Sequence, residues 1–138
     1  MPERPLPPVV GATENALRAL LEDVLSETSI GGYSEWVYLT IRIRADDSSP
    51  VEDLVSTALK EPLAAVEVLR TRMTEAGVLH ADGSLTSYGR DQFDHGRELI
   101  SSMTRSLTAG IDEEALTITI GTLDTIRERA EHLAKGFR

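Results

Sequence analysis

The sequence lacks cysteine, is poor in aromatic residues and contains no long apolar run, and each lack excludes a class of protein. Without cysteine the chain can form neither a disulfide nor a metal site with thiolate ligands. Aromatic residues make up only 4% of its 138 residues, too few to favour a surface that stacks sugars or bases. No apolar stretch reaches the ~20 residues of a membrane-spanning helix, and the first ten residues do not resemble a secretory signal. We therefore expect a cytoplasmic protein with no membrane partner.

The chain also lacks an excess of basic residues, because its net charge is −9. Hydrophobic residues make up 41% of it with few aromatic rings among them, a composition that suits packed helices. A chain of this length is a plausible single domain, which would bury roughly two thirds of the surface of its unfolded state. A negative total does not exclude a nucleic-acid partner, since charges of opposite sign can be segregated on different faces.

The most informative stretch runs from Pro62 to Arg90, and its first part predicts a helix from Pro62 to Ala76. Apolar residues recur there at spacings of three and four, which gives one apolar face at the helical period. Pro62 suits the start of a helix, where its missing N–H costs no hydrogen bond, and Gly77 suits the left-handed position just past the end. The apolar positions are Leu63, Val66, Leu69, Met73 and Ala76.

Two short extended segments are predicted next, Val78–His80 and Ser84–Thr86. Asp82 and Gly83 between them are a strong two-residue hairpin signal, because both positions of such a turn need a positive φ. Thr86 can then cap the helix that follows. A helix, a two-stranded wing and a second helix form the winged helix-turn-helix arrangement, whose first helix usually enters the major groove of DNA.

The segments before this stretch predict two more helices. Residues 1–12 contain four prolines and are expected to form an extended N-terminal arm. The residues from Thr13 to Glu27 carry a wide apolar stripe and are expected to be helical. Ser49 and Glu52 have the spacing of a capping box, with proline between them, ahead of a short helix that ends at Leu59.

Two long helices are expected after the wing. The first runs from Asp91 to Ala109, and the second begins at Asp112, where Ile111 and Leu116 have the spacing of a hydrophobic staple. Each helix carries a narrow apolar seam with a spacing near 3.5 residues, so the two can close on each other or on the same helices of a second subunit.

Residues 34–44 fit two structures. Alternating apolar residues with many β-branched side chains favour a strand, whereas a second set of positions fits one face of a helix that Ser34 could cap. The alternating positions are Val37, Leu39, Ile41 and Ile43, and the helical ones are Trp36, Leu39, Thr40 and Ile43.

The amino-acid sequence of the chain resembles that of the MarR family of bacterial transcription regulators. The segments LRTRMTEAGVL and LTSYGR are similar to the recognition helix, the wing and the start of the next helix in that family, and EWVYL and the two terminal helices fit its order. The resemblance covers nearly the whole chain except the first dozen residues. It implies a helix at 34–44 and a mainly α fold: a single domain of residues 13–138, with a winged helix-turn-helix lobe at 34–90 that includes a two-stranded wing.

The resemblance also implies a homodimer, formed by long terminal dimerisation helices at 13–30 and 91–138, and a DNA-binding transcriptional regulator. In a two-fold dimer the two reading helices would lie roughly 34 Å apart, one turn of DNA. The outward face of the helix from Pro62 and the nearby basic or wing residues are the candidates for contacts with double-stranded DNA. These candidates are Lys60, Ala64, Glu67, Val68, Thr71, Arg72, His80 and Arg90.

Two features weigh against direct DNA binding. Residues 51–97 carry eight acidic and five basic residues, a net charge of −3, and the expected wing tip contains no lysine or arginine that could enter a minor groove. Arg72 can either contact a phosphate or form a salt bridge within the helix-turn-helix. The alternative function is therefore a winged-helix dimer without direct DNA binding, which acts as a ligand- or protein-interaction module.

A small-molecule effector is the other expected partner. In the resembled family the effector binds between the dimer helices and the DNA-binding lobe, and four aromatic residues could line such a cleft, although they could equally pack in the core or brace loops. They are Tyr33, Trp36, Tyr38 and Tyr88.

An enzyme is not expected. The three histidines are far apart in the sequence, and no phosphate-binding loop or catalytic motif is present. Asp91, Asp94 and His95 could share one helix face, but a solvated face explains them as well as a metal site does. No catalytic residue, metal or cofactor is therefore expected.

Overall fold

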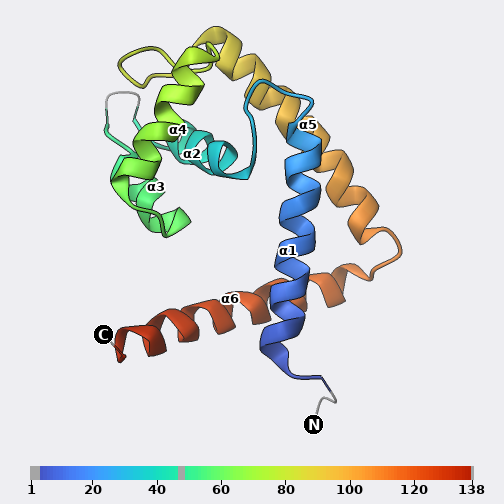
Figure 1. The fold of residues 1–138 in the computed structure, drawn as a ribbon. Coiled ribbons are helices and arrows are strands. Elements are labelled where there is room, and N and C mark those ends of the chain that lie inside the picture. The colour runs from blue at the N-terminus through green and yellow to red at the C-terminus, as the bar shows by residue number, and fades with distance from the viewer. Residues whose placement is uncertain (1–3, 47–48, 138) are drawn as a thin grey trace. The chain divides into compact units, whose positions relative to one another are not determined.

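The computed structural model describes residues 4–46 and 49–137, and helices dominate them (Figure 1). The chain divides into two compact units, Met1–Ser101 and Ser102–Arg138. The mainly α class expected from the sequence is confirmed. The helices are α1 (Leu6–Leu25), α2 (Tyr33–Arg44), α3 (Glu52–Leu59), α4 (Leu63–Glu75), α5 (Ser87–Thr108) and α6 (Glu113–Lys135).

Helix α1 begins at Leu6, so the prediction of an extended arm over residues 1–12 is wrong for residues 6–12; residues 1–3 lie outside the described part. Pro5 occupies the N-cap and Pro7 falls in the first turn, where a backbone N–H has no intrahelical partner and proline is tolerated. The described prolines, Pro5, Pro7 and Pro8, thus lie at the start of a helix instead of preventing one. At the far end of α1, Glu22 accepts a hydrogen bond of 2.9 Å from the backbone N–H of Tyr33, at the start of α2.

Residues 33–44 form a helix, so the helical alternative is confirmed and the strand alternative is wrong. The buried positions of α2 follow the spacing i, i+3, i+4, i+7 and differ from the alternating set that suggested a strand. Two of the four are charged, and both find hydrogen-bond partners. The buried residues are Glu35, Tyr38, Leu39 and Arg42.

Helices α3 and α4 form the helix-turn-helix. The predicted capping box is wrong in part, because Val51 and not Ser49 is the N-cap of α3; the carboxylate of Glu52 still reaches back, accepting from the backbone N–H of Val51 at 3.0 Å. Lys60 ends α3 in the left-handed region with φ 56°, and the backbone N–H of Glu61 donates to the carbonyl of Ser56, which is a Schellman ending.

The prediction of a helix from Pro62 to Ala76 is confirmed by α4. Pro62 is its N-cap, Ala76 its C-cap, and Gly77 follows with φ 80°. Val66 and Met73 are buried and anchor α4 in the core.

The prediction of a two-stranded wing is wrong, because no strand occurs in residues 4–46 or 49–137. Between α4 and α5 there is one isolated antiparallel bridge, Leu79 with Leu85. The carbonyl of His80 accepts from Gly83, and the N–H of His80 donates to Ser84, so the loop takes up most of the segment. Too few residues remain on either side for a second bridge, and we call residues 78–86 the wing turn.

The start of α5 and the start of α6 are both capped as predicted. Thr86 Oγ1 accepts from the N–H of Gly89 at 2.8 Å, so α5 begins at Ser87, four residues before the expected start. Asp112 caps α6 and accepts from the N–H of Ala115 at 3.2 Å. None of the residues of α6 is buried.

The core lies where the end of α1, the helices α2 to α4, the wing turn and the start of α5 meet. Trp36 stacks on Phe93 with 4.4 Å between ring centroids, and Gly96 lies directly against the indole. The buried apolar residues are Leu25, Ile30, Tyr38, Leu39, Val51, Val55, Val66, Met73, Val78, Leu79 and Phe93.

Candidate nucleic-acid interface

The face of α4 opposite its buried residues is open to solvent. Val66 and Met73 face the core, and an open hollow of about 320 Å³ lies along the other side, lined by α4 alone. Val68 in this hollow is 56% exposed, more than a packed valine would be. The lining residues are Glu67, Val68, Thr71, Arg72 and Glu75. Four of the eight residues expected to contact DNA are thus brought together on one helix face.

The two arginines of α4 both pair with carboxylates inside the lobe. Arg72 donates to Glu35 of α2 at 2.9 Å, and the side chain of Glu35 is 6% exposed whereas that of Arg72 is 63% exposed. Arg70 donates to Glu52 of α3 at 3.1 Å and to the carbonyl of Ala81 in the wing turn at 2.9 Å. Of the two roles expected for Arg72, the structure therefore shows the salt bridge within the helix-turn-helix. The side chain of Arg72 is nevertheless largely exposed to solvent.

Glu52 is the centre of a partly buried polar cluster. Its carboxylate accepts from the hydroxyl of Tyr38 at 3.3 Å as well as from Arg70 and Val51. Burial alone would raise the pKa of Glu52, but the hydrogen bonds from the backbone of Glu52 and Val51 and the charge of Arg70 lower it overall. Burial, and then the charge of Glu52, raise the pKa of Tyr38 to about 12. The cluster joins α2, α3, α4 and the wing turn.

The tip of the wing turn is acidic and polar. Asp82 accepts from both the N–H and the hydroxyl of Ser84, and these bonds lower the pKa of its carboxyl. His80 is exposed beside it. The residues of the tip itself include no lysine or arginine, and the guanidinium of Arg70, which reaches the tip from α4, is already paired with Glu52 and the carbonyl of Ala81.

The remaining DNA-contact candidates are also exposed. Lys60 lies in the turn between α3 and α4, Ala64 in the first turn of α4, and Arg90 in the first turn of α5. They come from three separate places on the surface of the lobe.

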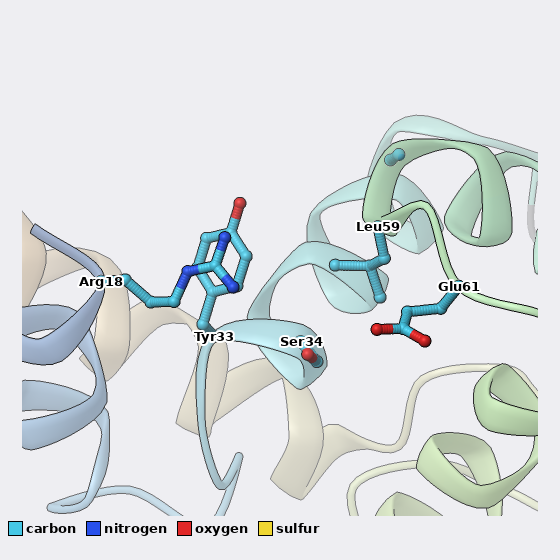
Figure 2. Close-up of a pocket in the computed structure, with 6 residues that line it drawn as sticks. Arg18, Tyr33, Ser34, Leu59 and Glu61 are labelled. Carbon is cyan, nitrogen blue, oxygen red and sulfur yellow. The ribbon is translucent and has the colours of Figure 1, made fainter. Parts of the chain in front are cut away.

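A second, smaller pocket lies between α1, the start of α2 and the end of α3 (Figure 2). The guanidinium of Arg18 lies over the ring of Tyr33, 4.7 Å from its centroid, and Leu59 and Glu61 reach in from the other side. Arg18 also pairs with Glu14 at 2.5 Å. Of these residues, only Tyr33 is a candidate for an effector site from sequence, because Arg18 and Glu61 are far from it in the chain and share no motif with it.

The four aromatic residues proposed for an effector cleft do not share one site. Tyr33 lines the small pocket, Trp36 stacks on Phe93, and Tyr38 is fully buried in the polar cluster. Tyr88 is 47% exposed and its hydroxyl pairs with that of Ser29.

No group of three or more histidine, aspartate and glutamate side chains in residues 4–46 and 49–137 could hold a metal ion. No helix in the same part of the chain combines the length and the apolar character needed to cross a membrane.

Comparison with known proteins gives a likeness in structure alone. No protein-family model matches the chain, and no curated protein sequence matches it. Among solved structures, the MarR family protein Rv2887 of Mycobacterium tuberculosis, in complex with salicylic acid, matches with a TM-score of 0.64 and 14% sequence identity. The match covers 89% of this chain and 98% of that one. The MarR-like fold expected from the sequence is therefore confirmed.

Proposed function

We propose that this protein is a dimeric MarR-like transcriptional regulator that binds duplex DNA through the exposed face of α4. The observation that supports this most is the open hollow along α4, in the second helix of a helix-turn-helix. A recognition helix needs one anchored face and one free face of small or polar residues to enter a major groove. Ala64, Val68 and Thr71 fit that need, because they are exposed and short enough for close approach to base edges.

Dimerisation through the terminal helices is part of the proposal. Large apolar side chains on α6 are open to solvent in the single chain: Ile120 is 54% exposed, Leu123 44% and Leu133 63%. Exposed apolar surface of this kind marks an interaction site. The residues recur near the 3.5-residue spacing that two paired helices share, so the same helix of a second copy is a suitable partner.

An effector site is proposed at the pocket beside Arg18 and Tyr33. The similar mycobacterial protein was solved with salicylic acid, an aromatic carboxylate. A guanidinium over a phenol ring offers such a ligand a cation for its carboxylate and a face for its ring. Binding there would favour one of two spacings between the reading helices, which is a population shift.

The test is the salt dependence of binding to generic duplex DNA. For a protein that makes four phosphate contacts, the affinity should fall about 100-fold between about 50 and 200 mM salt. Ala64→Glu should weaken binding at least about tenfold, because it puts a bulky anion on the exposed first turn of α4. Ala109→Glu, the same change in the exposed turn after α5, is the control and should bind as the unmodified protein does. Absence of binding at the lowest salt would contradict the proposal.

A second candidate function rests on the charge of the lobe. The arginines of α4 pair with Glu35 and Glu52, the wing turn carries no lysine or arginine, and residues 51–97 have a net charge of −3. These features favour a dimer that has lost direct DNA binding and recognises a protein or a small molecule instead. The measurement of duplex-DNA binding against salt concentration also distinguishes the two functions, because only the transcriptional regulator should bind DNA at low salt.

A further inference from the structure

Glu67 is an unusual residue to find at the centre of a DNA-reading face. It lies in the hollow along α4 between Ala64 and Thr71, one turn from each, and it is exposed. The arginine three residues further on, Arg70, is already engaged by Glu52 and Ala81. Within residues 4–46 and 49–137 the carboxylate of Glu67 has no hydrogen-bond or ion-pair partner, so it enters any complex with all of its acceptor capacity free.

A carboxylate can only accept hydrogen bonds, and the bases differ sharply in what they offer it. In the major groove cytosine presents its N4 amino group as a donor, whereas guanine and thymine present acceptor oxygens or nitrogen. Adenine presents a donor at N6 beside an acceptor at N7, so one carboxylate oxygen is satisfied and the other is repelled. Glu67 therefore favours cytosine first, adenine second, and opposes guanine and thymine.

The position of Glu67 along α4 suits base contact. It is the fifth residue of α4, in the N-terminal half that contacts base edges in helix-turn-helix proteins. Thr71 follows one turn later, about 6 Å further along the helix axis, which is less than two base-pair steps of about 3.4 Å. Val68 and Thr71 can both contact a thymine methyl group.

From this geometry we propose that Glu67 is a specificity-determining residue that selects one cytosine in each half-site, with a thymine within two base pairs of it contacted by Val68 or Thr71. The inference rests on the proposed DNA-binding function. It assigns the acidic character of α4 a role in base selection: an unpaired carboxylate in the groove is unfavourable on every sequence except one that supplies an amino donor.

The experiment selects bound duplexes from a pool with randomised sequence, using the full-length protein and two variants. The unmodified protein should select one cytosine per half-site, at least about tenfold over guanine or thymine. Glu67→Gln should shift that position to adenine, because a glutamine amide pairs with adenine N6 and N7. Glu98→Gln, which removes the same charge from an exposed position on α5, outside the hollow along α4, is the matched control and should leave the selected cytosine unchanged.

A modified base tests the contact without changing the protein. N4-methylcytosine keeps Watson–Crick pairing but places a methyl group where the major-groove N–H would be. At the selected position it should weaken binding of the unmodified protein at least about tenfold and leave binding of Glu67→Gln to its adenine site unaffected.

The possible outcomes separate the two claims. Suppose that all three proteins bind DNA. If Glu67→Gln selects the same cytosine as the unmodified protein, or if no position prefers cytosine, the role of Glu67 is overturned while the proposed DNA-binding function is retained. If the unmodified protein and the Glu98→Gln control bind no duplex at low salt, both claims are overturned. A shift from cytosine to adenine only in Glu67→Gln supports both.

Discussion

At the scale of single residues, burial and a neighbouring carboxylate raise the pKa of the Tyr38 hydroxyl. Its hydroxyl donates to Glu52, which also accepts from Arg70. Within this cluster the phenol is held in its neutral form, since ionisation would bring a second negative charge next to Glu52 in a buried place. The raised pKa, about 12, follows from that arrangement.

This predicts a loss of stability at high pH. An unfolded tyrosine ionises near pH 10, and Tyr38 ionises near 12 in the folded protein. Between these values the unfolded state releases its proton first, so the free energy of unfolding falls as the pH rises. The contribution is fully present below about pH 10 and is lost as the pH approaches 12, a total of about 2–3 kcal/mol.

Urea unfolding across that pH range should show a shallower decline for Tyr38→Phe than for the unmodified protein. Tyr33 and Tyr88 are present in both proteins, so their ionisation contributes equally and cancels in the comparison. Identical declines in the two proteins would contradict the role assigned to Tyr38.

At the scale of helices and turns, close contacts between backbones decide which glycines are required. Gly89, in the first turn of α5, lies against the carbonyl oxygen of Val78 in the wing turn, and a Cβ atom there would overlap that oxygen. A Cβ atom on Gly11 in α1 would meet no atom within 4 Å. The first glycine permits the wing turn to pack on α5, and the second only weakens its own helix.

The two alanine substitutions should therefore act in opposite directions. Gly89→Ala should lower the free energy of unfolding by about 1–3 kcal/mol, as overpacking does, whereas Gly11→Ala should raise it by about 0.5–1 kcal/mol through helix propensity. Urea titrations at one fixed protein concentration measure both. A stabilising Gly89→Ala would show that the wing turn does not pack on α5 as described.

Signals that act within a single helix or turn account for the elements that the sequence could predict. The bounds of α4 follow from Pro62 and Gly77, and the caps at Thr86 and Asp112 follow from local chemistry; all four signals act within a few residues. The wing prediction was wrong because Asp82 and Gly83 do not form a two-residue hairpin turn. Of the two only Gly83 has a positive φ, and the turn closes from the N–H of Gly83 to the carbonyl of His80, which leaves a single bridge.

Long-range contacts account for most of what sequence patterns missed. Glu35 is buried in α2 where it accepts from Arg72, and the terminal nitrogens of buried Arg42 donate to the backbone carbonyls of residues 46 and 49, although its Nε has no partner in the described part of the chain. Such partners are distant in the sequence, and charged residues are expected to be exposed. The exposed face of α4, by contrast, depends only on helical periodicity, and four of the candidate residues lie together on it.

At the scale of the whole molecule, the exposed apolar side chains of α6 predict that the protein is a dimer in solution. Leu123→Asp puts a charge in the middle of the apolar seam and should shift the protein to a monomer, because an unpaired charge is unfavourable in an apolar interface. Thr122→Asp introduces the same charge at the neighbouring exposed position outside the seam and should leave the dimer intact.

Sedimentation equilibrium distinguishes these states. The unmodified protein and Thr122→Asp should sediment with twice the mass of the 15.1 kDa chain, and the melting temperature of both should rise with concentration. An unmodified protein that stays monomeric at all concentrations would contradict the dimer.

The hydrogen bond from Arg70 to the carbonyl of Ala81 has a mechanical consequence for the lobe. The side chain of Arg70 on α4 donates hydrogen bonds both to the tip of the wing turn, at the carbonyl of Ala81, and to the start of α3, at Glu52. A tilt of α4 that left the tip in place would break the hydrogen bond to Ala81. This bond therefore favours joint movement of the helix and the tip, so that contacts made by one are linked to contacts made by the other.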